Sequence, residues 1–240
     1  MKQGIFVETK NVTAFRKAME NLTTRDRYQP GFAVIQGVSG RGKSQAAINW
    51  HGHNGGIFLR IWEGMTQHAF LQALAFEVTG AKIHGSYNCK REIVDHLGAE
   101  PAPIIVDEAD RLKFERIEDL RDIHEATGVS VVLIGESDKE GYYSKLKGRQ
   151  RIYSRVAEVV NFAPVEKADI ILYAAQAADL KIESEAAAAL AEEAHGSFRL
   201  VHNFVAKLEA FAKASKVTAI DLEALAGAGF GPAKKKGVRK

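Results

Sequence analysis

The chain has 240 residues, of which 46% are hydrophobic and 26% charged, as is usual for a soluble globular protein. This composition excludes a disordered or fibrous chain, and no apolar run reaches the 18 residues that a membrane-spanning helix needs. The formal net charge is +3, but the last ten residues hold five basic and no acidic groups, so the first 230 carry −2. Affinity for nucleic acid would therefore have to come from local patches and from this tail.

The N-terminus and the cysteine content bear on where the protein works. The opening "MKQGIFVETK" turns polar after a few positions, unlike the apolar segment of a signal peptide. The single cysteine, Cys89, cannot form an internal disulfide, which suits a reducing compartment. We therefore expect a cytoplasmic protein that has no membrane partner.

Short apolar runs of strand length recur along the first two thirds of the chain. The first is Phe32–Ile35, and helical patterns alternate with the runs that follow. The clearest helical pattern covers residues 66–78, with Thr66 as a candidate N-cap and Gly80 as a stop. Strands that alternate with helices predict an α/β fold with a parallel sheet covered on both faces. The other strands are expected at 57–61, 103–107, 129–135 and 158–162, and the other helices at 45–50, 89–97 and 116–126.

After Pro164 the sequence changes to alanine-rich helical segments without a strand-like run. Ser184 and Thr218 are candidate N-caps of two of these helices. The pattern predicts an α/β domain, a small helical domain and a basic flexible tail, at residues 1–163, 164–226 and 227–240. The helices of the second domain are expected at 166–179, 185–194, 198–213 and 219–226.

The segment "GVSGRGKS" lies between the first predicted strand and a predicted helix. It fits G-x-x-x-x-G-K-[ST], a loop whose backbone N–H groups surround nucleotide phosphates at a helix N-terminus. A flexible glycine turn with an incidental lysine is the alternative, but the strand-loop-helix context favours nucleotide binding. Lys43 would neutralise charge on the β and γ phosphates. The expected nucleotide contacts are Gly37, Val38, Ser39, Gly40, Arg41, Gly42, Lys43, Ser44 and Gln45.

The segment "PIIVDEAD" ends another hydrophobic strand and supplies two adjacent carboxylates. Asp107, together with Ser44, is expected to hold Mg²⁺, and Glu108 is expected to orient and deprotonate the attacking water. The two carboxylates are also compatible with the capped start of a helix. The phosphate loop some sixty residues upstream favours the catalytic interpretation, in which ATP is hydrolysed.

Five segments together resemble a known family. The order of "GVSGRGKS", "PIIVDEAD", "VVLIGES", "GRQRIYSRV" and "GSFRLVHNF" resembles that of the AAA+ ATPases. The spacing of "VVLIGE" and "RIYSRV" is similar to that in the phage Mu B-type DNA transposition ATPases. The resemblance covers roughly residues 5–215, although only the first two segments are highly specific. It implies a P-loop core with a five-stranded parallel sheet flanked by helices, followed by a small α-helical lid.

The resemblance also implies a function. It implies an ATP- and Mg²⁺-dependent protein that assembles into rings or helical filaments, binds double-stranded DNA and marks target sites for a transposase. The host cell would be bacterial, and the gene would belong to a phage or a transposon. The resemblance implies an N-terminal helix-turn-helix domain in the Mu-type protein, and we expect no counterpart of it here, because only about thirty residues precede the first strand. A helicase loader or replication initiator with the same ATP site is the main alternative, and a nucleotide-regulated scaffold without nucleic acid is a third.

A basic segment carries the next role that the resemblance implies. Arg155 matches the arginine with which one subunit completes the ATP site of its neighbour, and Arg149 and Arg151 are close alternatives. A guanidinium suits this role because it stays ionised and is rigid. An exposed basic face is the plain alternative.

The two sensors of the family are matched unequally. Arg199, in a segment with Gly196 and Asn203, matches the second sensor, an arginine of the lid that reaches the γ phosphate. At the first sensor the family has Asn, Thr or Ser, whereas this chain has Glu136, whose carboxylate would repel a phosphate. Two alternatives follow: Ser137 serves as first sensor instead, or hydrolysis is slow.

Candidate DNA contacts follow from the expectation that loops lining a central channel bind the duplex backbone. No base-reading helix can be identified, so largely non-specific phosphate binding is expected. Each candidate is equally compatible with a solvated surface. Trp50 and Trp62 lie in patterned elements and are expected in the core rather than on a stacking surface. The candidate contacts are Thr66, Gln67, Lys82, Lys90, Arg91, Lys234, Lys235 and Lys236.

Overall fold

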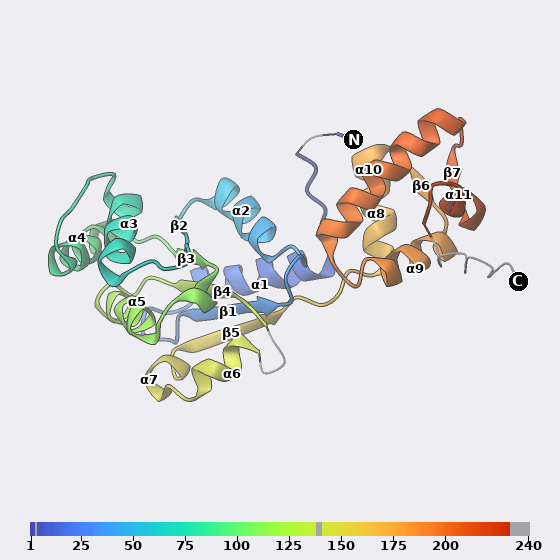
Figure 1. The fold of residues 1–240 in the computed structure, drawn as a ribbon. Coiled ribbons are helices and arrows are strands. Elements are labelled where there is room, and N and C mark those ends of the chain that lie inside the picture. The colour runs from blue at the N-terminus through green and yellow to red at the C-terminus, as the bar shows by residue number, and fades with distance from the viewer. Residues whose placement is uncertain (3, 138–140, 231–240) are drawn as a thin grey trace, which may run out of the picture. The chain divides into compact units, whose positions relative to one another are not determined.

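The computed structural model describes residues 1–2, 4–137 and 141–230 (Figure 1). The chain divides into two units, one formed by Lys10–Phe162 and the other by Met1–Thr9 with the chain from Ala163 onward. Each unit has its own cluster of buried apolar side chains. Within the described residues, no helix has the length and apolar character of a membrane span.

The larger unit is built on a parallel five-stranded sheet with the strand order β2-β3-β4-β1-β5. The central strands bury all of their apolar side chains, as expected of a parallel sheet with both faces covered. The five predicted strands are confirmed, and no end is shifted by more than two residues. They are β1 (Phe32–Gly37), β2 (Ile57–Arg60), β3 (Ile104–Asp107), β4 (Val131–Glu136) and β5 (Val156–Asn161).

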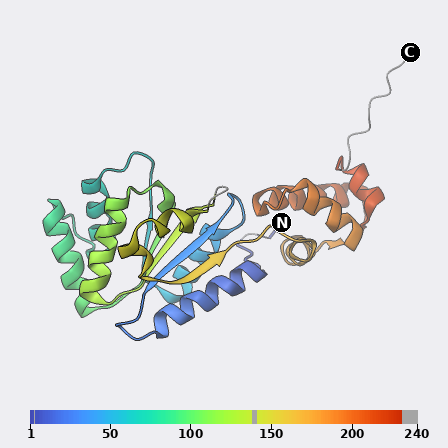
Figure 2. The same ribbon diagram turned by 90° about the horizontal axis from the view of Figure 1, so that it is seen from below.

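Helices cover both faces of this sheet. Helix α1 packs on β1 and β5 and meets α2, whereas α3, α4 and α5 pack side by side (Figures 1 and 2). The connection from β1 to β2 runs toward the β2 edge of the sheet, whereas the later connections run toward the β5 edge. Because such crossovers are right-handed, α2 lies on one face of the sheet and the later helices lie on the other. The helices are α1 (Lys10–Thr24), α2 (Lys43–Asn54), α3 (Gln67–Thr79), α4 (Ser86–Ala99), the short η1 (Ala109–Arg111), α5 (Phe114–Thr127), α6 (Tyr142–Lys147) and α7 (Gln150–Tyr153).

The predicted limits of α3 are confirmed by its caps. The Thr66 hydroxyl accepts a hydrogen bond from the backbone N–H of Ala69 at 3.2 Å, so it is the N-cap. Gly80 ends the helix with φ 70°, a left-handed conformation that glycine adopts at little cost. The start of α3 is therefore fixed directly after β2.

The smaller unit is helical and also contains a short parallel strand pair, which the sequence interpretation excluded. Helix α11 begins after Asp221, whose carboxylate caps it, so the predicted cap at Thr218 is wrong. Ser184 is the first residue of α9 and accepts a bond from Lys167 Nζ instead of capping the helix. The elements are α8 (Lys167–Ala178), β6 (Lys181–Ile182), α9 (Ser184–Glu193), α10 (Phe198–Ser215), β7 (Ala219–Ile220) and α11 (Leu222–Gly227).

The first nine residues belong to this smaller unit. The backbone N–H of Lys2 donates to Ala177 O at 2.7 Å, and Val7 is buried in the cluster of the helical unit. The domain limits at 163 and 226 stay a prediction. Most of the predicted tail, residues 231–240, lies outside the described residues.

Candidate nucleotide site

The polar residues singled out from the sequence meet at the carboxyl edge of the sheet. Strand register places Gly37 opposite Glu136 and Arg60 opposite Asp107. Parallel strands end at a common edge, where ligands of open α/β sheets bind. The phosphate loop, residues 37–44, therefore adjoins the carboxylates of β3 and β4.

Close backbone packing shapes the phosphate loop. A Cβ on Gly37 would lie 2.8 Å from Phe162 O, so no larger residue fits there without movement of the backbone. Gly42 has φ 94° just before α2 begins, again a conformation suited to glycine. Arg41 Nη1 donates to Phe162 O at 2.8 Å and ties the loop to the end of β5. The loop is thereby held at the first turn of α2, where anions are favoured.

Lys43 lies across this loop. Its Nζ donates to Gly37 O at 2.6 Å and to Val38 O at 3.1 Å. Burial lowers the pKa of Lys43 from its ordinary value, and the nearby carboxylates, Glu136 foremost, oppose that shift. A nucleotide phosphate would compensate the positive charge of Lys43 and accept hydrogen bonds from its ammonium group.

Ser44 and Asp107 form the part of the site suited to a divalent cation. Ser44 Oγ donates to Asp107 Oδ1 at 2.9 Å, and Asp107 is only 1% exposed. A hydroxyl and a carboxylate at this spacing are hard oxygen ligands of the kind that Mg²⁺ prefers. The two residues expected to hold Mg²⁺ are thus brought together.

Arg60, at the end of β2, is a residue of this site that sequence reasoning missed. Its Nε and Nη2 each lie 2.9 Å from Asp107 Oδ2. The only available signal was a charged residue ending the otherwise apolar run 57–61. Arg60 compensates the buried Asp107 carboxylate on the side opposite Ser44.

Glu108 occupies the N-cap position of η1 in an uncommon backbone conformation. Its φ and ψ are 59° and 36°, a left-handed conformation that is strained for a non-glycine residue. Its side chain makes no capping bond to η1 and instead pairs with Arg111 at 3.2 Å. Glu108 follows Asp107 directly in the chain, and its side chain is 36% exposed, so its carboxylate can reach water.

The candidate first-sensor residues are joined to the phosphate loop. Glu136 Oε1 accepts a bond from the backbone N–H of Ser39 at 3.4 Å, and Ser137 N donates to Gly37 O at 3.1 Å. The backbone N–H of Glu136 donates to Asp110 Oδ1 at 2.9 Å. Glu136 thus accepts a hydrogen bond from a backbone N–H of the loop itself.

Arg155, in the basic segment 149–155, lies away from this site. The backbone N–H of Phe32, at the start of β1, donates to Arg155 O at 2.8 Å, so Arg155 lies at the opposite, amino edge of the sheet. Arg149 lies over the ring of Phe114 at 4.7 Å, and Arg151 is exposed. Arg155 therefore does not approach the phosphate loop of its own subunit.

Arg199 belongs to the helical unit. It is exposed in the first turn of α10, which Ser197 caps by accepting from the backbone N–H of Leu200. A Cβ on Gly196 would lie 2.6 Å from Pro164 Cβ, which explains the glycine at this position. The second-sensor role of Arg199 stays a prediction.

The candidate DNA contacts differ in how free they are. Lys90 donates to Asp119 at 3.1 Å and to Asp122, and Gln67 also donates to Asp119. Arg91 is mostly exposed and Lys82 is exposed, whereas the Thr66 hydroxyl is used as a cap. Lys234, Lys235 and Lys236 lie outside the described residues.

The expectation for Trp62 is wrong. Its side chain is 70% exposed, because β2 ends at Arg60 and the next residue, Ile61, fills the core at 1% exposure. Trp50 is half-buried in α2. An exposed tryptophan therefore lies on the loop that leads to Thr66.

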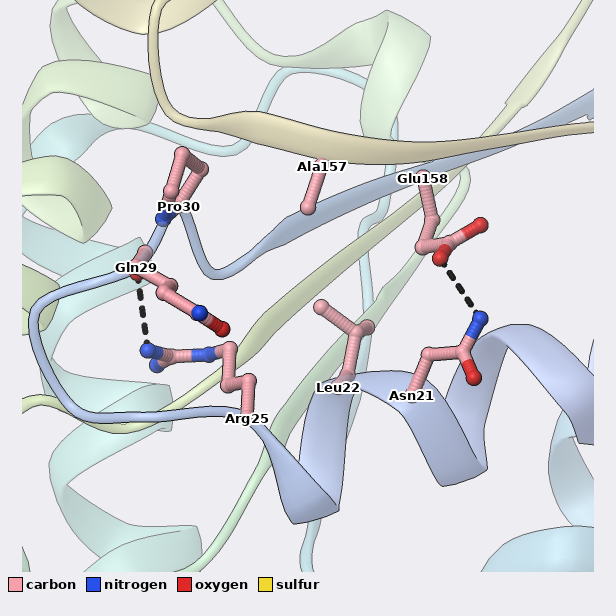
Figure 3. Close-up of a pocket in the computed structure, with 7 residues that line it drawn as sticks. All are labelled: Asn21, Leu22, Arg25, Gln29, Pro30, Ala157 and Glu158. Carbon is pink, nitrogen blue, oxygen red and sulfur yellow. Dashed lines mark hydrogen bonds between the residues drawn. The ribbon is translucent and has the colours of Figure 1, made fainter.

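A cavity of about 380 Å³ lies at the amino edge, between the end of α1 and β5 (Figure 3). The side chains that line it bond to groups of the protein. Asn21 donates to Glu158 at 2.8 Å, and Arg25 donates to Gln29 O and to Gly128 O. These contacts hold the α1–β1 connection in place, and the cavity is separate from the phosphate loop.

Comparisons with known proteins agree with this geometry. Residues 25–142 match the family described as AAA domain. The chain is 29% identical over 165 residues to the Mu-like prophage FluMu DNA transposition protein B of Haemophilus influenzae. The aligned segment covers 64% of this chain and 56% of the relative. It is 27% identical over 182 residues to the ATP-dependent target DNA activator B of Escherichia phage Mu, and this alignment covers 69% of this chain and 54% of the relative. The chain thus spans about half the length of these curated relatives.

Solved structures share the fold. The ORC2 protein of Aeropyrum pernix superposes with a TM-score of 0.67 at 14% identity, over 95% of this chain and 70% of that one. The RuvB Holliday junction branch migration motor of Thermotoga maritima gives 0.57 at 16% identity, over 93% and 69%. From the phosphate loop, the sheet order and these matches together, we conclude that the chain contains an AAA domain, has an AAA+ fold and is distantly homologous to the Mu B and FluMu B transposition proteins.

Proposed function

We propose that this protein is an ATP-dependent, largely non-sequence-specific DNA-binding ATPase that assembles on double-stranded DNA and delivers target DNA to a transposase. The observation that carries the ATPase part is the arrangement of Ser44 and Asp107, 2.9 Å apart beside the phosphate loop, with Glu108 next in the chain. Phosphate binding, cation binding and water activation are thus available within one edge of the sheet.

The chain's own residues divide the work of hydrolysis. The loop amides and Lys43 would bind the β and γ phosphates, and Ser44 and Asp107 would hold Mg²⁺, which supplies charge neutralisation when bound. Glu108 would accept a proton from the attacking water as its oxygen bonds to the γ phosphorus and the bond to the ADP oxygen breaks. Glu136 would release Ser39 N–H to the nucleotide, leaving Ser137 beside the γ phosphate.

Assembly is proposed because one subunit does not bring all these groups together. Arg155 lies at the amino edge of the sheet, whereas the phosphate loop lies at the carboxyl edge. A neighbouring copy, in a ring or a helical filament, could place its Arg155 against the γ phosphate. Arg199 would reach the same phosphate from the helical unit.

DNA and a transposase enter as partners through the homologues, one of which is described as a target DNA activator and another as a DNA transposition protein. Thr66, Lys82, Arg91 and the lysines of the tail are the proposed phosphate contacts. Lys90 would first have to leave Asp119 and Asp122, so we rank it below Arg91. Backbone contacts of this kind confer affinity without sequence preference.

Competition between random duplex DNA and single-stranded DNA, with ATP or ADP present, tests the proposal. We expect tighter duplex binding with ATP than with ADP, and displacement by duplex competitor only. Preference for single strands would favour the helicase loader or initiator. Absence of binding to either would leave an ATPase that acts on protein alone.

A further inference from the structure

A charged cluster on α5 contacts the guanidinium of Arg155. Arg155 Nη2 lies 2.7 Å from Glu125 Oε1, and its Nη1 donates to Ser154 Oγ at 2.9 Å. The side chains of Arg155 and Glu125 are 38% and 37% exposed, so the pair lies at the surface. The orientation of Arg155 is therefore set by one carboxylate and one hydroxyl.

Glu125 is itself fixed by a second arginine. Arg121 Nη1 donates to Glu125 Oε2 at 2.9 Å, Nη2 donates to Asp122 at 2.7 Å, and Nε donates to Glu118 at 2.6 Å. Arg121 is only 16% exposed, and every nitrogen of its guanidinium is engaged. We call Glu118, Arg121, Asp122 and Glu125 the α5 bracket.

The charge state of Glu125 suits a role in holding Arg155. Burial raises the pKa of Glu125, but the hydrogen bonds from Arg121 and Arg155 outweigh it and leave the pKa below its ordinary value. Glu125 is therefore a carboxylate at neutral pH. Both of its oxygens accept from guanidinium groups, so its rotamer is defined from two sides.

This arrangement leaves part of Arg155 available. A guanidinium has five N–H donors, and the bonds to Glu125 and Ser154 need only two of them. A donor group held in one orientation before the partner arrives loses less entropy on contact. A surface ion pair contributes only about 0–1 kcal/mol to the free energy of folding. Stability alone therefore does not account for the Arg155–Glu125 pair.

We propose that Glu125, fixed by Arg121, is a positioning residue that orients Arg155 toward the ATP site of a neighbouring subunit. This inference rests on the proposed function, in which Arg155 acts in trans. Glu125 touches neither nucleotide nor water and acts only through Arg155. Its removal should slow hydrolysis in the assembled protein while ATP binding stays the same.

The experiment compares steady-state ATP hydrolysis by assembled full-length variants on duplex DNA. Glu125→Gln is expected to lower kcat about tenfold with KM for ATP unchanged. Glu125→Asp, which keeps the charge, should recover part of the loss. Glu115→Gln is the matched control, because it makes the same change at an exposed position of α5 outside the bracket, and its kcat should stay within about twofold of wild type.

A double variant separates positioning from a general effect. In an Arg155→Ala background, Glu125→Gln should cause no further loss, because it acts only through Arg155. A further loss of the same size, or a higher kcat for Glu125→Gln alone, would overturn the positioning role. If Arg155→Ala lowers kcat but Glu125→Gln does not, only the positioning role of Glu125 is overturned. If Arg155→Ala itself leaves kcat unchanged, the trans role of Arg155 in the proposed function fails as well.

Discussion

Asp107 is the residue on which the nucleotide site is centred. It is buried at the end of β3, yet Ser44, Arg60 and the backbone N–H of Glu108 all donate to its carboxylate. A buried carboxylate is tolerated when it is paired and hydrogen-bonded in this way. The same three contacts orient the carboxylate that, together with Ser44, would hold Mg²⁺.

The contribution of Arg60 can be measured by replacing it. Arg60→Gln should lower the free energy of unfolding by about 1–2 kcal/mol, because Asp107 loses a charged donor while Arg60 itself is half-exposed. Urea unfolding measures the difference. Arg91→Gln, which removes an exposed arginine from a surface pair with Glu92, should change the free energy by less than about 0.5 kcal/mol. Equal effects of the two substitutions would contradict the pairing.

His124 makes stability depend on pH. It is buried, its Nδ1 donates to Val129 O at 2.7 Å, and its ring meets the edge of Phe32. Burial lowers the pKa of His124 below 6.5, so the unfolded chain binds the proton more readily. The contribution of neutral, buried His124 to stability is complete above pH 6.5. It is lost as the pH falls through the lower pKa that His124 has in the folded protein.

The test is urea unfolding of wild type and His124→Gln between pH 7.5 and 5. The stability of wild type should fall more steeply toward acid pH than that of His124→Gln, whatever the difference at pH 7.5. His53→Gln, at an exposed position of α2, should keep the slope of wild type. Parallel slopes for wild type and His124→Gln would show that this histidine does not couple folding to protons.

At the scale of elements, the sequence predicted what depends on apolar pattern and on short motifs. The five strands, α3 with its caps, and the meeting of Ser44 with Asp107 follow from buried runs and from the common edge of parallel strands. Helix α1 was missed although its buried residues Val12, Phe15, Met19 and Leu22 recur at helical spacing, so this signal was present in the sequence and was not used. The two-residue strands β6 and β7 were missed because a run of that length has no period to detect.

The side-chain partners were less predictable than the elements. Arg60, Glu125 and the exposed Trp62 depend on strand ends and on which side chains face one another, and single-sequence patterns place element ends only to within a few residues. The N-cap of α11 is an example, since Thr218 and Asp221 are both good capping residues. Only the position of β7 decides between them.

This difference between the two caps can be tested by hydrogen exchange. Asp221→Ala should weaken the protection of α11 amides by an amount equivalent to about 1 kcal/mol, because the backbone N–H of Ala224 loses its partner. Thr218→Ala should leave these amides within experimental error of wild type. Stronger loss of protection from Thr218→Ala than from Asp221→Ala would mean that α11 begins earlier than the structure places it.

At the scale of the whole molecule, charge is unevenly distributed along the chain. The five basic groups of residues 231–240 exceed the formal net charge of +3, so the tail is the main sequence-based candidate for salt-dependent DNA binding. Deleting residues 231–240 should flatten the dependence of log affinity on log salt by up to about 4.5 for duplex DNA, because each phosphate that one of the five basic side chains neutralises adds about 0.9 to the slope. Binding measured across a salt series should stay ATP-dependent. An unchanged slope would make the tail irrelevant to DNA, and complete loss of binding would misplace the DNA site.

Residues 37–44, Asp107 and Glu108 form the proposed ATP site. Titration of a fluorescent ATP analogue, with parallel measurement of phosphate release, tests it on three proteins: wild type, Lys43→Ala and Glu108→Gln. Lys43→Ala should lose binding, because the phosphates lose their cation, whereas Glu108→Gln should bind like wild type and release almost no phosphate, because only the base is removed. Equal affinity of wild type and Lys43→Ala for the analogue would contradict the account.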